Sequence, residues 1–212
     1  MSELRAILLI GPTGAGKTPL GDFLEAEGLW QSRCFHFDFG RAMRNAVDGG
    51  ASDGVLSRAE TDFLAGVLRS GALLEDGQFG IAEKILSSFV DARGIGGGDL
   101  IILNGLPRHV GQAADVGRLV RVVMVACLSC SPEAVLERIR TNAGGDRAGR
   151  RDDGLEAVRR KQEIFHARTL PLVAHYRSAG VRVEEFDVTV ATVPEDVARA
   201  IGAVGIRETK PC

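Results

Sequence analysis

No apolar run in this 212-residue chain approaches the length of about 18 residues that a membrane-spanning helix needs. The first residues also lack the charged start and long apolar segment of a secretory signal peptide, so we expect residues 7–10 to form a buried strand. The formal net charge is only −2, which gives the molecule no overall field toward nucleic acid or a membrane surface. We therefore expect neither as a partner.

Cysteine is also scarce, with Cys34, Cys127, Cys130 and Cys212 in the whole chain. These are too few for a disulfide scaffold in a chain of this length. Cys127 and Cys130 form a C-x-x-C pattern, but no second pair of Cys or His residues stands at zinc-site spacing. The cysteines are therefore predicted to be structural or incidental, and their scarcity favours the reducing cytoplasm as the compartment.

Lysine is rare as well, with four among 26 basic residues, and Lys17 lies in a distinctive pattern. The segment reads Gly11-Pro12-Thr13-Gly14-Ala15-Gly16-Lys17-Thr18, a complete G-x-x-x-x-G-K-S/T loop between an apolar run and a helical pattern. Its glycines allow successive backbone N–H groups to turn around an anion at a helix N-terminus. The alternative is a glycine-rich turn before a helix. In its context the pattern predicts a nucleotide-phosphate site, with Lys17 on the β- and γ-phosphates and the Thr18 hydroxyl on Mg²⁺.

Apolar runs alternate with helical patterns along the chain, which favours βαβ units in one α/β domain with a five-stranded parallel sheet. Strands are expected near 5–10, 34–38, 99–103, 121–128 and 181–186. Helices are expected near 17–27, 40–47, 57–69, 77–92, 109–118, 131–141, 154–178 and 194–204. Two stretches depart from the alternation. Residues 39–93 form a helical insertion, and the glycine-rich, charged residues 142–153 either close over a ligand or form a solvated connector.

A second polar segment follows the apolar residues 100–103. It reads Asn104-Gly105-Leu106-Pro107-Arg108, and the carboxyl ends of parallel strands are where α/β folds bind ligands. Gly105 permits close backbone approach, and Arg108 offers a fork for a phosphate. Taken alone, the segment also fits a turn with an exposed arginine.

In their order and spacing, these segments resemble those of the adenylate kinase-like nucleoside monophosphate (NMP) kinases, over about residues 5–204. The matching segments are 11–18; 40–44, similar to G-D-x-x-R; 71–76, similar to G-x-L-V-x-D; 104–108 with Gln112, similar to D-G-F-P-R…Q; and 150–153, similar to the lid motif R-x-D-D. The resemblance implies a three-layer P-loop NTPase fold with helices on both faces of the sheet. It also implies one kinase domain, 1–212, with an NMP-binding insertion at about 39–93 and a short lid at about 142–153.

The resemblance further implies roles for individual residues. Lys17, Arg108, Arg150 and Lys161 would act on the transferring group. The ATP site would comprise Gly11, Gly14, Ala15, Gly16, Lys17, Thr18 and Pro19, with Arg138 stacked on the donor adenine. The acceptor site would comprise Phe39, Gly40, Arg44, Leu73, Leu74, Gly105, Arg108 and Gln112; Arg44 and Arg108 would bind the acceptor phosphate, and Gln112 would read the base. Thr18 and, through water, Asn104 would hold Mg²⁺.

Several positions depart from the family pattern. Arg41 replaces the Asp of G-D-x-x-R, and Asn104 replaces the strand-end Asp that orients hydrated Mg²⁺. Lys161 provides a point charge where the family has an arginine fork. Phe39 stands where the family has a small or hydroxylic residue near the acceptor base, so the ring either stacks on a base, fills the pocket or belongs to the core.

Together the motifs predict a monomeric cytoplasmic enzyme that uses Mg²⁺ and ATP to phosphorylate an NMP, with AMP favoured, giving nucleoside diphosphates. Two alternatives stay open. A P-loop kinase for another small acceptor, such as a sugar acid, would explain Phe39 and Arg41, but Gln112 counts against it. A degenerate nucleotide-binding regulatory protein would explain Asn104 and Lys161, but the intact loop counts against that.

Overall fold

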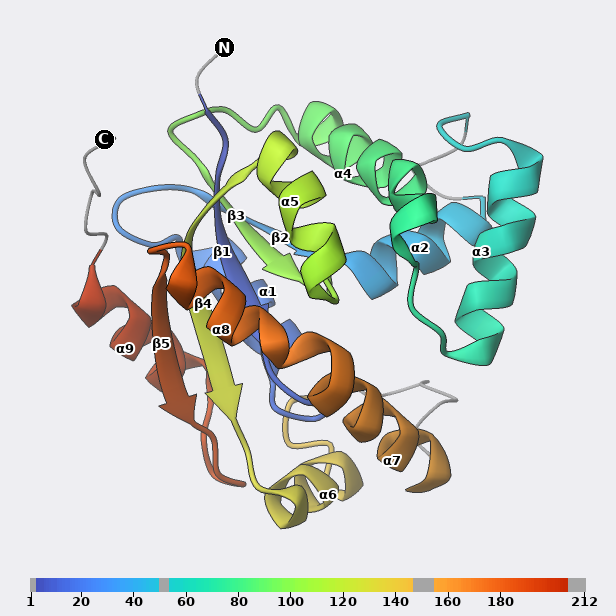
Figure 1. The fold of residues 1–212 in the computed structure, drawn as a ribbon. Helices are drawn as coiled ribbons and strands as arrows, with labels where there is room; N and C mark the ends of the chain where they lie inside the picture. The colour runs from blue at the N-terminus through green and yellow to red at the C-terminus, as the bar shows by residue number, and fades with distance from the viewer. Residues whose placement is uncertain (1–2, 50–53, 147–154, 206–212) are drawn as a thin grey trace.

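The computed structural model describes residues 3–49, 54–146 and 155–205 (Figure 1). Its strands are β1 (Arg5–Ile10), β2 (Cys34–Asp38), β3 (Leu100–Asn104), β4 (Arg121–Ser129) and β5 (Arg182–Asp187). Its helices are α1 (Lys17–Glu27), α2 (Phe39–Val47), α3 (Arg58–Ser70), α4 (Phe79–Arg93), α5 (Val110–Leu119), α6 (Pro132–Arg140), α7 (Leu155–Ile164), α8 (Pro171–Ser178) and α9 (Pro194–Val204), with a 3₁₀ turn at Asp76–Gln78. Within these ranges, no helix is both long enough and apolar enough to cross a bilayer.

The strands form one parallel sheet in the order β2-β3-β1-β4-β5, which confirms the predicted five-stranded parallel sheet. β1 lies at its centre between β3 and β4. Because all strands run in the same direction, the segments that follow β1, β2 and β3 begin at the same edge of the sheet. The phosphate-binding loop, the end of β2 and the end of β3 therefore lie together at that edge of the sheet.

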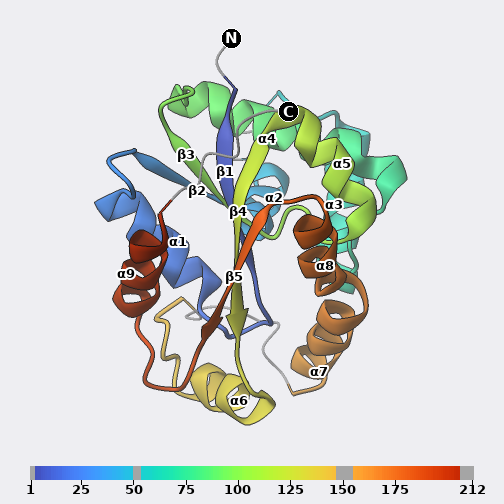
Figure 2. The same ribbon diagram turned by 60° about the vertical axis from the view of Figure 1, so that its left-hand side comes forward.

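Side chains of β1 alternate between two hydrophobic cores, because successive residues of a strand point to opposite faces of the sheet. Ala6, Leu8 and Ile10 belong to a core that includes residues of α4, α5 and α8. Ile7 and Leu9 belong to a second core with residues of α1 and α9. Figure 2 shows the two helical layers on opposite sides of the sheet. The predicted three-layer architecture is confirmed.

The stretch between β2 and β3 is helical, as expected. Its described residues form α2, α3 and α4 and contain no strand. Asp38 caps the N-terminus of α2 by accepting a hydrogen bond from the backbone N–H of Arg41, and Ser57 and Glu60 form a capping box at the start of α3. α2 and α3 lie beyond the β2 side of the sheet (Figure 1), whereas α4 also contributes to the core that covers one face of the sheet. Their role in binding an acceptor stays a prediction.

The segment predicted as a helix near 154–178 is helical, with one irregularity in its middle. A π-helical turn at Phe165–Thr169 separates α7 from α8, whose first residue is Pro171. Proline has no N–H to continue the ladder, and the backbone N–H of Leu170 instead donates to the carbonyl oxygen of Phe165, at 2.8 Å. The turn places Phe165 and Thr169 on the wall of the cleft described below.

Candidate active site

The loop after β1 requires glycine at three positions. Gly14 and Gly16 have φ angles of 90° and 91°, which residues with a side chain rarely adopt. A Cβ atom at Gly11 would lie 2.9 Å from the carbonyl oxygen of Leu128 on β4, so glycine permits the close approach of loop and sheet. Gly16 leads directly into α1. The N–H groups of the first turn of this helix therefore lie at the loop, in the arrangement that binds phosphate.

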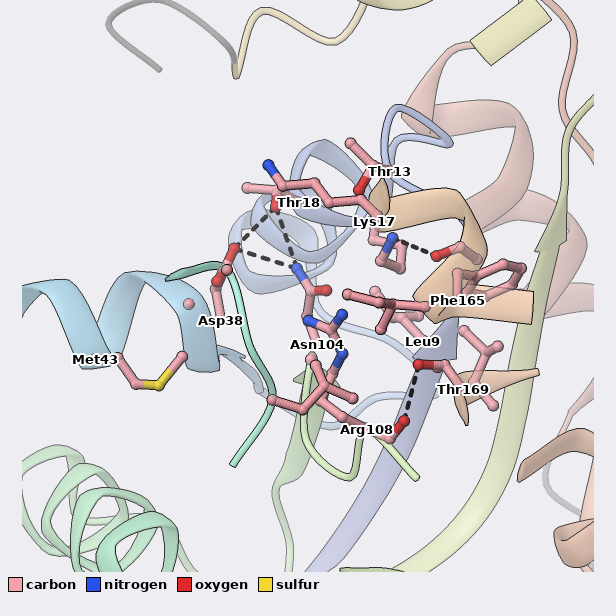
Figure 3. Close-up of a pocket in the computed structure, with 18 of the residues that line it drawn as sticks. Leu9, Thr13, Lys17, Thr18, Asp38, Met43, Asn104, Arg108, Phe165 and Thr169 are labelled. Atoms are coloured by element: carbon pink, nitrogen blue, oxygen red, sulfur yellow. Dashed lines mark hydrogen bonds between the residues drawn. The ribbon is translucent and has the colours of Figure 1, made fainter. Parts of the chain in front are cut away.

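Lys17 lies along the same loop. Its ammonium group donates hydrogen bonds to the carbonyl oxygens of Gly11, at 2.6 Å, and Pro12, at 2.9 Å. Lys17 and Thr18 both line the cleft at this edge of the sheet (Figure 3). The ammonium group of Lys17 therefore lies where the oxygens of a bound phosphate could replace these carbonyl oxygens as its hydrogen-bond acceptors.

Three side chains from three elements meet beside the loop (Figure 3). Thr18 on α1 donates its hydroxyl hydrogen to Oδ2 of Asp38, at 2.9 Å. Asn104 donates through Nδ2 to Oγ1 of Thr18, at 3.1 Å, and to the same Asp38 oxygen, at 3.2 Å. The sheet brings Asp38 and Asn104 together because they are register partners on β2 and β3. Hydroxyl and carboxylate oxygens are ligands that Mg²⁺ prefers, and Mg²⁺ in phosphoryl-transfer sites takes only one or two of them from the protein.

Asp38 was not predicted as a site residue. The available signal was its position at the carboxyl end of an apolar strand, which is also the position of Asn104 on the next strand. Burial raises the pKa of the Asp38 carboxyl, but hydrogen bonds from the backbone of Arg41 and the hydroxyl of Thr18, together with electrostatic attraction by His36 and Arg41, outweigh burial, and the net shift is downward. The carboxylate therefore carries its charge at neutral pH, next to the Thr18 hydroxyl.

Arg41, which stands where the family has an Asp, does not line the cleft. Its guanidinium pairs with Asp22 on α1, at 3.2 Å. The same Asp22 oxygen lies 2.7 Å from Nδ1 of the buried His36, whose Nε2 lies 3.4 Å from the amide nitrogen of Asn104. Gly21 leaves the room for this imidazole, since a Cβ there would lie 2.4 Å from the ring. His36 thus supports the Asn104 side chain from within the fold.

The backbone of Arg108 is held from both sides. Its N–H donates to Oε1 of Gln112, at 2.8 Å, and its carbonyl oxygen accepts from the hydroxyl of Thr169, at 2.8 Å. Burial lowers the pKa of the Arg108 guanidinium, and the charge of Asp38 partly opposes that effect. An arginine stays protonated in proteins, so a partly desolvated cation is presented to the cleft, where it attracts an anion more strongly than in water.

Helices of the insertion supply the facing wall of the cleft. Gly40, Met43 and Arg44 come from α2, and Leu73 follows α3; all four line the cleft together with the loop, Asn104, Gly105 and Arg108. Lys161 on α7 lines it as well. The structure therefore brings the predicted cations Lys17, Arg44, Arg108 and Lys161 around one cavity. Arg150 and most of the predicted lid, residues 147–153, lie outside the described residues.

Three residues predicted for the acceptor site do not line this cleft. Phe39 has only 3% of its surface exposed and packs against Phe37, with ring centroids 6.0 Å apart. In this structure it is a core residue, one of the possibilities that its alternating pattern left open. Leu74 and Gln112 are buried, and Nε2 of Gln112 donates to the carbonyl oxygen of Leu74, at 2.9 Å. Both ends of the Gln112 amide therefore bond to the backbone, and its contact with a base stays a prediction.

Arg138 is also buried. Its guanidinium donates to the carbonyl oxygens of Gly14, at 3.1 Å, Thr189, at 2.7 Å, and Thr192, at 3.0 Å. It thereby joins the phosphate-binding loop to the segment between β5 and α9. Stacking on a donor adenine stays a prediction, and so do the contacts of Ala15 and Pro19, which are not among the residues that line the cleft.

Known proteins are similar to this chain over most of its length, although no family model matches it. It is 30% identical over 210 residues to an adenylate kinase of Thermus thermophilus, a match that covers 95% of this chain and 98% of that protein. The chain belongs to the adenylate kinase family. An adenylate kinase of Stenotrophomonas maltophilia is also 30% identical, over 93% of this chain and 98% of its own length. One of Parvibaculum lavamentivorans is 29% identical, over 82% and 80%.

Membership of the adenylate kinase family accounts for the common features of the site. This protein is an adenylate kinase-like phosphotransferase, and family membership supports NMP kinase activity in general. The loop, the strand-end segment after β3 and the helical insertion are the parts that carry the family pattern. Asn104, which departs from the family pattern, is the last residue of β3, and its register partner Asp38 is the last residue of β2.

Proposed function

We propose that the protein transfers the γ-phosphoryl group of Mg²⁺-bound ATP to AMP, giving ADP. One observation carries the proposal: the loop cation Lys17 and the arginines Arg44 and Arg108 line the same cleft from different elements. A donor triphosphate on the loop and an acceptor phosphate on the arginines would then share one cavity. The choice of AMP rests on the similar proteins named adenylate kinases.

The protein's part in this reaction is positioning and charge neutralisation. Loop N–H groups and Lys17 would bind the donor phosphates, while Arg44 and Arg108 would hold the acceptor phosphate in line. Lys161 and Arg150 would follow the charge of the transferring group. The attacking oxygen of a phosphate monoester is already ionised, so no general base is required.

The residues beside the loop fit a magnesium ion. The Thr18 hydroxyl and the Asp38 carboxylate supply hard oxygen ligands or hydrogen-bond partners for its water. When bound, Mg²⁺ would neutralise negative charge on the phosphate groups of ATP.

The test is a panel of acceptors with Mg²⁺ and ATP: AMP, CMP, UMP, GMP and the deoxy-NMPs, with nucleoside diphosphates measured as products. We expect AMP to have the highest kcat/KM, and the Lys17→Ala variant to lose the activity with every acceptor. A higher kcat/KM for another base would refute the choice of AMP. ATP binding without phosphorylation of any of these acceptors would instead favour a kinase for a different small acceptor or a nucleotide-binding regulatory protein.

A further inference from the structure

The negative charge beside the Thr18 hydroxyl comes from the end of β2, whereas the family motif predicts an acid at the end of β3. The last residue of β3 is an amide, Asn104, whereas the last residue of β2 is an acid, Asp38. The two are register partners, and their side chains are joined by a hydrogen bond of 3.2 Å. The site therefore retains a carboxylate next to Thr18, but the carboxylate stands one strand away from the position that the family motif predicts.

We propose that Asp38 is the residue that orients Mg²⁺ in this protein, in place of an acid at the end of β3, and that Asn104 is its hydrogen-bond donor. The proposal rests on the use of Mg²⁺-bound ATP proposed above. It assigns to Asp38 a metal-directed role and to Asn104 a positioning role.

The hydrogen bonds indicate a separate role for each of the three side chains, Thr18, Asp38 and Asn104. A carboxylate only accepts hydrogen bonds, so the amide nitrogen of Asn104, not its oxygen, must face Asp38. Oδ1 of Asp38 accepts from the backbone of Arg41, and Oδ2 accepts from both Thr18 and Asn104. The Thr18 hydroxyl is free to rotate its hydrogen away from Asp38. The hydroxyl oxygen of Thr18 and Oδ2 of Asp38 can then both face a cation or the water bound to it.

The same geometry explains why an acid at both strand ends is unfavourable. An Asp at position 104 would bring a second carboxylate to about the hydrogen-bond distance from Oδ2 of Asp38, and like charges so close repel each other. One acid and one amide avoid this repulsion. Since the two positions are neighbours across the ladder, the acid can stand on either strand, provided that the amide stands on the other.

The experiment compares four variants: Asp38→Asn, Asn104→Asp, the exchange Asp38→Asn with Asn104→Asp, and Asp22→Asn as a control. Asp22 is a nearby acid that bonds to His36 and Arg41 and does not line the cleft, so its replacement by Asn removes a negative charge near the site without removing an oxygen that lines the cleft. Asn replaces Asp at an N-cap at little cost, so α2 should stay folded in Asp38→Asn. Circular dichroism and thermal melting verify the fold of each variant.

Metal binding is measured without turnover. Electron paramagnetic resonance detects the binding of Mn²⁺ to the protein with a non-hydrolysable ATP analogue, and calorimetry measures the binding of that analogue without metal. We expect Asp38→Asn to raise the Mn²⁺ concentration at half-saturation about 10- to 100-fold, the range for residues that support a metal ligand, with the metal-free affinity retained. The exchange variant should recover most of the loss, and Asp22→Asn should bind Mn²⁺ like the parent protein.

Three results would overturn the inference: unchanged Mn²⁺ binding in Asp38→Asn, an equal loss in Asp22→Asn, or no recovery in a folded exchange variant. The outcome is independent of the acceptor. If the parent protein binds Mn²⁺ as described but makes no ADP from AMP, the proposed function fails and the metal assignment stands.

Discussion

For Gln112, the family pattern and the tertiary structure suggest different roles, and replacing this residue distinguishes the two. The motif assigns it to the acceptor base, whereas the structure uses its amide to hold the backbone of Arg108 and of Leu74. We consider Gln112→Leu, which keeps the approximate size of the side chain and removes both hydrogen bonds.

The expected cost follows from what each partner loses. The carbonyl oxygen of Leu74 keeps a second donor, Nε2 of His109 at 3.1 Å, so its loss is small. The N–H of Arg108 loses its acceptor, and an unsatisfied buried donor costs about 1–3 kcal/mol. For a chain of this length, about 2–4 °C of Tm per kcal/mol gives a decrease of about 2–12 °C. Because Arg108 becomes less well oriented, the KM for the acceptor should rise for every NMP by a similar factor.

The assay combines thermal melting with kcat and KM for AMP, CMP, UMP and GMP. Thr169→Val provides a matched comparison, because it removes the hydrogen bond on the other side of the Arg108 backbone with little change in shape. Both variants should leave the order of preference among the acceptors unchanged. An unchanged Tm together with a new order of preference in Gln112→Leu would refute the positioning role and return Gln112 to the base site.

Further predictions concern catalysis, the core and ionisation. Lys17→Ala should lower kcat about 10²- to 10³-fold or more without lowering the Tm, since a preorganised charge is lost; an unchanged rate in a folded variant would exclude the loop from the reaction. Phe39→Thr should cost several degrees of Tm through a cavity of the kind that costs about 3–5 kcal/mol, and leave acceptor preference unchanged, whereas the opposite result would place Phe39 in the base pocket. Burial raises the pKa of the Cys34 thiol to about 12, so mass spectrometry should find it unalkylated by iodoacetamide at pH 8 in the folded protein and alkylated in denaturant. The hydrogen bond from Arg33 lowers the pKa of Asp99, so Asp99 stabilises the fold above the ordinary carboxyl pKa of about 4 and loses this effect as the pH falls. Melting curves from pH 7 to pH 3 should therefore show a deficit in Asp99→Asn that shrinks toward pH 3; a constant deficit would contradict the assignment.

The local sequence was sufficient to predict the positions of the strands and of the phosphate-binding loop. β1 and β3 are short apolar runs that are buried on both faces of the sheet, as expected for the centre of a parallel sheet. The loop depends on Gly14 and Gly16, whose left-handed φ angles are a requirement of the loop itself, and on the helix that starts at Lys17. Such features are encoded within about ten residues, which is why the pattern alone predicted them.

The irregularity in the long helix had a local signal in the sequence, Pro171, but the helical pattern around it was given more weight. Pro171 lacks the N–H that a continuous helix needs at that position, and the chain responds with the π-helical turn at Phe165–Thr169. The helical pattern over 154–178 nevertheless favoured one helix. The turn matters for the site, because it aims Thr169 at the backbone of Arg108.

Tertiary structure alone decided which polar residues meet. Asp38 and Asn104 are distant in sequence, and only the pairing of β2 with β3 in this register places both beside Thr18. Whether Phe39 faces a pocket or the core depends on what packs on it, because an alternating strand pattern is the same in both cases. The side-chain amide of Gln112 likewise has no fixed partner in sequence and finds Arg108 and Leu74 only when the chain is folded. Backbone conformation is set by neighbours along the chain, whereas the chemistry of this cleft is set by neighbours across the sheet.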